Sequence, residues 1–178
     1  MSKILHAILV GGLVAAASVA LSGCYASEHS VVAVADRVQP LKEGHYCEYD
    51  YDMGTGKPGD TCEPATLART SDGSYVLTHD GQDGSYTVSI SSHTVTGGSF
   101  KDYALTEACY SDKDGSGCFV GAVSLIDSNT AYWVLPKCDE PSTGADPCKL
   151  TSEGQALAAF AAAGPAMDDM RKLVWQSN

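Results

Sequence analysis

Turn-forming residue pairs divide the middle of the chain into segments that are too short for most helices. The clearest pairs are Asp72-Gly73, Asp83-Gly84 and Gly97-Gly98. Glycine adopts positive φ without steric cost, so such pairs are typical of tight turns between antiparallel strands. In one intervening segment, Tyr86, Val88 and Ile90 alternate with serine and threonine. Alternation with a period of two predicts a half-buried antiparallel strand.

The same pattern recurs along most of the chain. Strand-like runs cover residues 45–53, 66–69, 75–79, 85–91, 100–110, 118–126 and 131–135. Several short strands at close spacing are typical of an all-β meander. We therefore predict a mainly β fold, either a small antiparallel barrel or a sandwich, and the sequence leaves these two architectures open.

The pattern becomes helical after residue 147. Ser152 and Gln155 have the spacing of a capping box, which predicts the start of a helix. Leu157 and Phe160 then fall on one helical face, and Gly164-Pro165 ends the segment. A first C-terminal helix is therefore expected between Ser152 and Gly164.

A second helix is predicted after Pro165, a residue that suits the first turn of a helix. Asp168 and Asp169 precede Arg171 and Lys172, which is the order that the helix dipole favours. The apolar residues of this segment either pack on the sheet or cover the mouth of a barrel as a lid. They are Met167, Met170, Val174 and Trp175.

Six cysteines follow residue 24, at Cys47, Cys62, Cys109, Cys118, Cys138 and Cys148. An even number in an exported chain predicts three disulfides, for which about 15 pairings exist. Pairing between nearest neighbours is preferred, because each such pair flanks a turn rich in glycine, proline or aspartate. No C-x-x-C pair occurs and His45 has no partner histidine at ligand spacing, so we expect no structural zinc and no other metal.

The N-terminal segment has the composition of an export signal. Lys3 is its only formal charge, and an interrupted apolar run then leads to Leu21-Ser22-Gly23-Cys24. The run is too short for a regular membrane span, so a cleaved signal over residues 1–23 is expected. The four residues that end at Cys24 resemble the lipobox of bacterial lipoproteins.

This resemblance implies that Cys24 is the first residue of the mature chain and carries lipid on its sulfur and amine, with fatty acids such as palmitate. Two or three acyl chains hold a domain stably on a membrane. Tyr25, rather than aspartate, follows the cysteine. By the sorting tendency of the family, this favours the outer membrane of the cell envelope, on its periplasmic side. Residues 24–40 are predicted to be a tether, and residues 41–178 a single domain.

The chain is acidic, with a formal net charge of −11. Nucleic-acid binding needs a basic surface, so this class of partner is excluded. The charge also argues against docking on anionic lipid through the protein surface. The membrane contact would then be the acyl chains alone, and a basic protein is the partner that the charge would favour.

One predicted strand combines an acidic and an aromatic face. Alternation places Glu48, Asp50 and Asp52 on one face and Tyr49 and Tyr51 on the other. We interpret the carboxylates as a solvated outer face, which is also a possible binding face for a basic partner.

A second acidic stretch resembles the first half of an EF-hand calcium loop. In such a site Asp112, Asp114 and Ser116 would be the ligands. The twelfth position holds Val123 where a bidentate glutamate is needed, and strand-like sequence follows. We therefore predict a hairpin loop instead of a calcium site.

A glycine-rich stretch, Gly54 to Gly59, matches the spacing of a dinucleotide-binding loop. That motif requires a helix directly after it, so that the helix N-terminus can bind a pyrophosphate. Pro58 and Cys62 follow here without a helical pattern. We predict a loop and expect no cofactor.

No sequence motif identifies a catalytic centre. The sequence lacks the serine-hydrolase elbow, the Walker phosphate-binding loop of P-loop NTPases and the H-E-x-x-H zinc motif. His45, His79 and His93 lie in strand-like segments and are interpreted as surface residues. We therefore predict a protein that is not an enzyme.

Three functions remain open from the sequence. The first is the binding of a small apolar molecule or a protein partner, with Tyr49, Tyr51, Trp133 and Trp175 as candidate contacts. The second is an acidic interaction module that inhibits a basic cell-wall enzyme. The third is an envelope hydrolase whose triad is assembled only in space.

Overall fold

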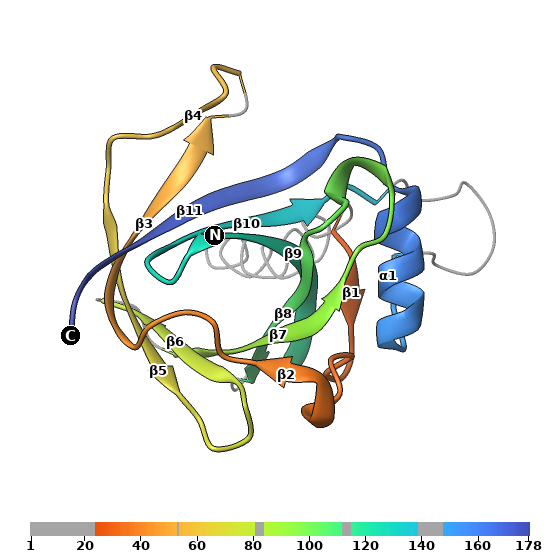
Figure 1. Cartoon of the computed structure of the whole chain (residues 1–178), viewed down its shortest axis with the longest axis horizontal. Coiled ribbons are helices and arrows are strands. Elements are labelled where there is room, and N and C mark those ends of the chain that lie inside the picture. The colour runs from red at the N-terminus through yellow and green to blue at the C-terminus, as the bar shows by residue number, and fades with distance from the viewer. Residues whose placement is uncertain (1–23, 53, 81–83, 112–114, 139–147) are drawn as a thin grey trace, which may run out of the picture.

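Eight antiparallel strands close into a barrel, seen as a ring in Figure 1. The computed structural model describes residues 24–52, 54–80, 84–111, 115–138 and 148–178. The barrel strands are β3 (Gly44–Asp52), β5 (Glu63–Arg69), β6 (Tyr75–His79), β7 (Tyr86–Thr94), β8 (Ala104–Ser111), β9 (Ser116–Asp127), β10 (Thr130–Pro136) and β11 (Met167–Ser177). Each strand pairs with the next, and β11 pairs with β3. The mainly β prediction is confirmed, with a barrel in place of a sandwich.

Shorter elements lie around the barrel. They are β1 (Ala26–Ser27), β2 (Arg37–Val38), the hairpin strand β4 (Lys57–Pro58), the 3-10 turns η1 (Val34–Asp36) and η2 (Gly98–Phe100), and the helix α1 (Glu153–Ala162). The glycine-rich stretch from Gly54 to Gly59 was predicted to be a loop, but it forms a turn followed by the short strand β4, which pairs with β3.

The first predicted C-terminal helix is confirmed as α1. The Ser152 hydroxyl accepts a hydrogen bond from the backbone N–H of Gln155, as expected for an N-cap. Ala156 and Phe160 are fully buried against the outer wall of the barrel. Figure 1 shows α1 outside the ring, so this helix supports the wall and does not cover the mouth.

The second predicted helix is wrong, because residues 167–177 form β11. This strand lies between β10 and β3 and closes the barrel. Its inward positions change from charged to apolar along the strand, from Asp169 and Arg171 to Leu173 and Trp175. An inward face of mixed polarity conceals the period-two pattern, while the charge order imitates a helix.

Two apolar cores share the barrel wall. The inner core fills the barrel with side chains such as Tyr46, Tyr75 and Ile90. The outer core lies between the wall and α1, and includes Phe100, Val120 and Phe160. Wall strands such as β8 and β9 therefore bury both faces along most of their length.

The predicted tether over residues 24–40 is wrong, because this segment packs on the barrel. β1 pairs with β9 and β2 pairs with β7. Tyr25 stacks edge-on against Phe160 of α1, with ring centroids 5.1 Å apart. Val31 and Val32 are buried in the outer core. Burial of these apolar residues places the domain boundary before residue 25 instead of near Leu41.

The three disulfides join nearest neighbours, as preferred from the sequence. The pairs are Cys47–Cys62, Cys109–Cys118 and Cys138–Cys148. Within the described part of the chain, no helix is long and apolar enough to cross a bilayer.

Candidate functional site

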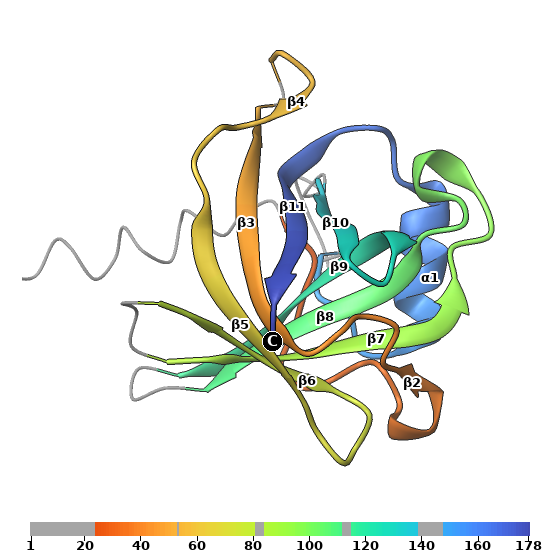
Figure 2. The same ribbon diagram turned by 60° about the vertical axis from the view of Figure 1, so that its left-hand side comes forward.

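The two ends of the barrel differ, because the chain segment before β3 closes one of them. Leu41 lies across this end and is 4% exposed. The Tyr75 hydroxyl accepts the Leu41 N–H at 2.8 Å and donates to the Leu41 carbonyl at 3.1 Å. Tyr46 donates to the Lys42 carbonyl at 2.8 Å, and Trp175 Nε1 donates to the Glu43 carbonyl at 3.0 Å. In Figure 2 the C-terminus of β11 lies at this closed end.

The opposite end is open and contains a cavity of about 420 Å³. Eleven residues line it: Glu48, Glu63, Leu77, His79, Tyr86, Ala108, Phe119, Trp133, Leu135, Asp169 and Arg171. They come from all eight barrel strands. Below it, side chains fill the barrel and leave a space of only about 20 Å³. A molecule bound here would occupy the upper part of the barrel.

One side of the cavity is apolar and is formed by β7 to β10. Phe119, Trp133 and Leu135 lie on this side. Tyr110 stacks on Phe119 at the rim, with ring centroids 5.7 Å apart. This side offers contact area to an apolar or aromatic group.

The indole of Trp133 occupies space that Gly121 of the neighbouring strand β9 leaves free. A Cβ atom at Gly121 would lie 2.8 Å from Trp133 Nε1 and 2.6 Å from the Val134 carbonyl oxygen, so only glycine leaves room for the indole. The Trp133 N–H is buried and has no hydrogen-bond partner within the described residues. An unpaired buried donor is costly, and a ligand acceptor would satisfy it.

The other side of the cavity is charged and is formed by β11, β3, β5 and β6. Arg171 contacts four carboxylates, with nitrogen–oxygen distances of 3.2 Å to Glu48, 3.1 Å to Asp50, 3.1 Å to Glu63 and 3.1 Å to Asp169. Arg171 is the only lysine or arginine among the lining residues that the structure describes. The cluster therefore keeps an excess of negative charge.

The carboxylates hold Arg171 in its charged form. Burial alone would lower the pKa of the guanidinium, but the charges of Asp169, Glu48 and Asp50 outweigh burial and raise this pKa above its usual value. Arg171 is therefore a positive charge within the cavity.

His79 and Glu48 form a second polar pair in the cavity. His79 Nε2 lies 3.0 Å from Glu48 Oε2, and their side chains are 15% and 9% exposed. Tyr86 packs edge-on against the imidazole, with centroids 6.2 Å apart. A carboxylate that orients an imidazole can support proton transfer. No serine, threonine or cysteine is among the described lining residues, and the only hydroxyl beside this pair there is the phenol of Tyr86.

The predicted acidic face does not form one outer surface. Residues along β3 alternate between two faces as predicted, but the face that carries Glu48 points into the barrel instead of outward. Glu48 is 7% exposed and points into the cavity, and Asp50 reaches Arg171 at the rim. Asp52 accepts the backbone N–H groups of Gly54 and Thr55 in its own turn. Hydrogen bonds from Thr55 and Gly54 lower the pKa of Asp52.

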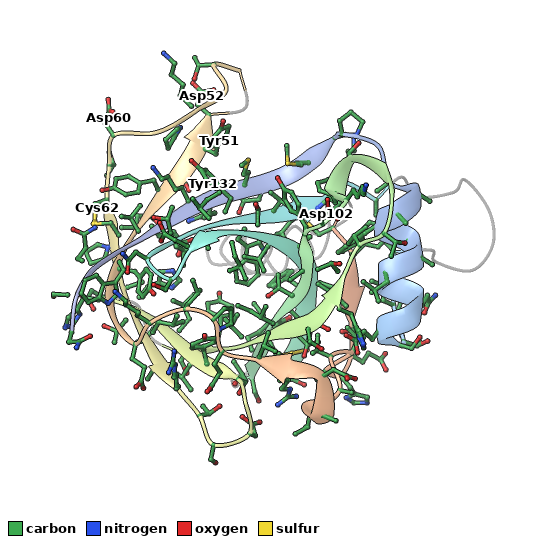
Figure 3. The ribbon with its side chains drawn as sticks, viewed as in Figure 1. Tyr51, Asp52, Asp60, Cys62, Asp102 and Tyr132 are labelled. Atoms are coloured by element: carbon green, nitrogen blue, oxygen red, sulfur yellow. A yellow bond between two sulfur atoms is a disulfide. The ribbon has the colours of Figure 1, made fainter. Side chains whose placement is uncertain are left out.

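The predicted aromatic contacts are divided among three places. Trp133 lines the cavity, and Trp175 lies at the closed end. Tyr51 faces outward against Tyr132 of β10, with ring centroids 6.2 Å apart (Figure 3). Tyr49 alternates with inward Glu48 and so lies on the outer face of β3.

Most cavity residues were not singled out from the sequence. His79 was interpreted as a surface residue, which is wrong, because it lies inside the barrel with Glu48. Arg171 and Asp169 were assigned to a helix that does not exist. Period-two alternation shows which residues share a face, but the partners across the barrel that decide its direction are distant in sequence.

The stretch that resembles half of an EF-hand was predicted to be a hairpin loop and not a calcium site. Asp112 and Asp114 lie outside the described residues, and Ser116 begins β9. Among the described residues, Asp36, His93 and Glu153 have ligand atoms within 4.8 Å of one another on the outer surface. Glu153 already bonds to Ser91 and to His93.

Comparison of the chain with protein-family models, with curated proteins and with solved structures found no match. A function therefore has to follow from the cavity, its charges and the N-terminal motif.

Proposed function

We propose that this chain is a bacterial envelope lipoprotein, anchored through lipid on Cys24, that binds one small amphipathic molecule at the open end of its barrel without chemical turnover. The observation that carries the binding role is the cavity of about 420 Å³ with one apolar and one charged side. Small-molecule sites have volumes of about 300 to 1,000 Å³. The anchor is supported by the lipobox-like residues Leu21-Ser22-Gly23-Cys24.

The cavity favours a ligand with an apolar body and a polar end. The body would lie against Phe119, Trp133 and Leu135, and the polar end would reach the cluster around Arg171. Four carboxylates surround that one guanidinium. A neutral or positively charged polar end is therefore favoured over an anionic one. This adds a polar group to the small apolar ligand expected from the sequence.

The two alternative functions have less support. An acidic module for a basic protein needs carboxylates on an accessible face, whereas Glu48 lies inside the cavity and already contacts Arg171 and His79. A hydrolase of the serine, threonine or cysteine type needs one of these nucleophiles beside its base, and none is among the described lining residues around the His79–Glu48 pair.

The binding role is tested with two fluorescent probes that share an aromatic framework. N-phenyl-1-naphthylamine is neutral, and 1-anilinonaphthalene-8-sulfonate carries a negative charge. Residues 25–178, which contain all eight strands, are expressed in an oxidising compartment and titrated with each. We expect one neutral probe to bind per chain, and the anionic probe to bind at least about tenfold more weakly, which is 1.4 kcal/mol.

A matched pair of variants locates the binding. Ala108 lines the cavity, whereas Ala68 is exposed on β5. Ala108→Phe fills the cavity and should abolish probe binding, while Ala68→Phe should leave it unchanged. If Ala108→Phe does not fold, Leu135→Trp narrows the same space at the rim. Unchanged binding in a folded cavity variant would refute the proposal.

The anchor is tested by the mass of the mature protein isolated from bacterial membranes. A chain that begins at Cys24 and carries acyl groups is expected. Replacement of Cys24 by alanine should release the protein from the membrane fraction. A mature mass without acyl groups would contradict the anchor and leave the binding role unaffected.

A further inference from the structure

The N-terminal segment completes the barrel wall at the open end. Cys24 forms an antiparallel bridge with Lys137, just after β10, and Ala26 pairs with Phe119 of β9. Phe119 and Leu135 both line the cavity. Cys24 is therefore built into the rim, on the apolar side of the mouth.

Backbone hydrogen bonds fix this segment from its first residues. The Val120 N–H donates to the Tyr25 carbonyl at 3.0 Å. The Ala26 N–H donates to the Cys148 carbonyl at 2.9 Å, and the Leu150 N–H donates to the Ala26 carbonyl at 2.8 Å. Tyr25 itself is 9% exposed. The chain leaves no flexible spacer between Cys24 and the barrel.

A buried carboxylate holds the next part of the segment. Glu107 of β8 is fully buried on the outer wall. It accepts the Val31 N–H at 2.7 Å and the Val32 N–H at 3.3 Å, and it also bonds to Ser30. A free spacer of sixteen residues would span up to about 50 Å and would permit any orientation. The bound segment permits only a small range of orientations of the barrel relative to Cys24.

We propose that the lipid anchor holds the open end of the barrel against the bilayer, so that the cavity exchanges its ligand with the membrane. This inference rests on the proposed acylation of Cys24. Acyl chains attached at the rim enter the bilayer directly beside Phe119 and Leu135, the apolar side of the mouth. The ligand is then an amphiphile that resides in the membrane.

The charge of the mouth determines which lipid headgroups can lie against it. Glu48, Asp50, Glu63 and Asp169 give the far side of the mouth a negative excess around Arg171. An anionic headgroup would be repelled, whereas a zwitterionic or cationic one would be accepted. The anchor, not the charge of the protein surface, sets the orientation.

The chain has two tryptophans, and they mark the two ends of the barrel. Trp133 lines the cavity, and Trp175 lies beside Glu43 at the closed end. Trp133 is opposite Arg171 in the ladder, four residues from Trp175. Four strand residues correspond to about 13 Å. Energy transfer from each tryptophan to the membrane surface therefore reports the orientation.

The acylated mature protein is reconstituted into phosphatidylcholine vesicles that contain a lipid with a dansyl headgroup. Trp175→Phe leaves Trp133 as the donor, and Trp133→Phe leaves Trp175. We expect at least about twofold more transfer from Trp133, because of the separation of the two ends along the strands. Equal transfer, or more transfer from Trp175, in an acylated protein would overturn the inference.

A second measurement needs no variant. Lys57 is exposed on β4, which pairs with the last residues of β3 at the open end, and Lys42 is exposed at the closed end. In vesicles, acetylation of Lys57 should be slower than in detergent, while that of Lys42 should not change. Equal protection of both lysines, or protection of Lys42 alone, would contradict the orientation. Absence of acyl mass would instead refute the anchor itself, so the two failures are distinguishable.

Discussion

Arg171 brings together four carboxylates that would otherwise repel one another across the open end of the barrel. The arginine is about one-third exposed, whereas the Glu48 side chain is 9% exposed. Solvent screens part of these interactions, so their contribution is smaller than in a fully buried cluster. The same residue gives the cavity its charged side, and stability and ligand choice therefore depend on one position.

Replacement of Arg171 by methionine should lower the free energy of unfolding at pH 7 by about 1 to 3 kcal/mol. Without the cation, the four carboxylates repel one another across the open end. Added salt screens this repulsion, so the deficit should shrink as ionic strength rises. Urea unfolding at low and at high salt measures this, with Lys101→Met as the exposed control. A deficit that stays constant would contradict the electrostatic cause.

The titration of Tyr46 sets an alkaline limit to the stability of the fold. This side chain is 1% exposed, and burial is the main reason that its pKa is raised to about 12. Above pH 10 the unfolded chain loses the phenol proton while the folded chain keeps it. The contribution of Tyr46 to the free energy of unfolding is therefore fully present below pH 10, and about 2 to 3 kcal/mol of it is lost as pH rises toward 12.

Tyr46→Phe removes this titration, although Tyr75, whose pKa is also raised by burial, remains. At pH 7 the variant should lose about 1 kcal/mol, because its hydrogen bond to the Lys42 carbonyl is lost. From pH 9 to 11.5 its urea midpoint should fall less steeply than that of the wild type. Parallel slopes would show that Tyr46 does not set the limit.

At the scale of elements, Glu107 attaches the N-terminal segment to the wall. Its carboxylate accepts the N–H groups of Val31 and Val32, which otherwise have to be buried without a partner. Glu107→Ala should lower stability by about 2 to 4 kcal/mol. Hydrogen exchange of the amides in residues 27–36 should accelerate more than that of the β5 amides. Slow exchange in this segment would show that Val31 and Val32 hold it without the carboxylate.

The sequence predicted elements well where their residues interact locally. Turn pairs, alternation in β7, the N-cap at Ser152 and the pairing of neighbouring cysteines all depend on residues close in sequence. The sequence did not predict features that depend on contacts between residues distant in the chain. The direction of Glu48 and the strand character of β11 both depend on the contact between Arg171 and the carboxylates of β3 and β5. The burial of residues 24–38 depends in the same way on Glu107.

At the scale of the whole molecule, the three disulfides reinforce the open end. Cys47–Cys62 joins β3 to the segment before β5, Cys109–Cys118 joins β8 to β9, and Cys138–Cys148 lies beside β1. The closed end is held by Leu41 and its hydrogen bonds instead. The cavity thus has a covalently supported rim.

The paired cysteines are 15, 9 and 10 positions apart in the sequence. By loop entropy each disulfide contributes about 2.6 to 3.0 kcal/mol, and the three together contribute about 8 kcal/mol, which is comparable to the whole stability of a typical domain. Loss of Cys138–Cys148 alone, with both residues replaced by alanine, should leave a folded protein weakened by about 2 to 3 kcal/mol. Full reduction should unfold most of the molecules, as near-ultraviolet circular dichroism would detect. A reduced protein with an unchanged spectrum would contradict this.

β11 has a further consequence for how the protein is made. It is the last strand of the chain, yet it lies between β10 and β3, and β3 is the first strand of the barrel. Until β11 is in place, β3 and β10 each present an unpaired edge, and the interior is exposed between them. A folding intermediate that lacks β11 is therefore an open sheet that is prone to aggregation, and it needs protection by a chaperone until this strand inserts.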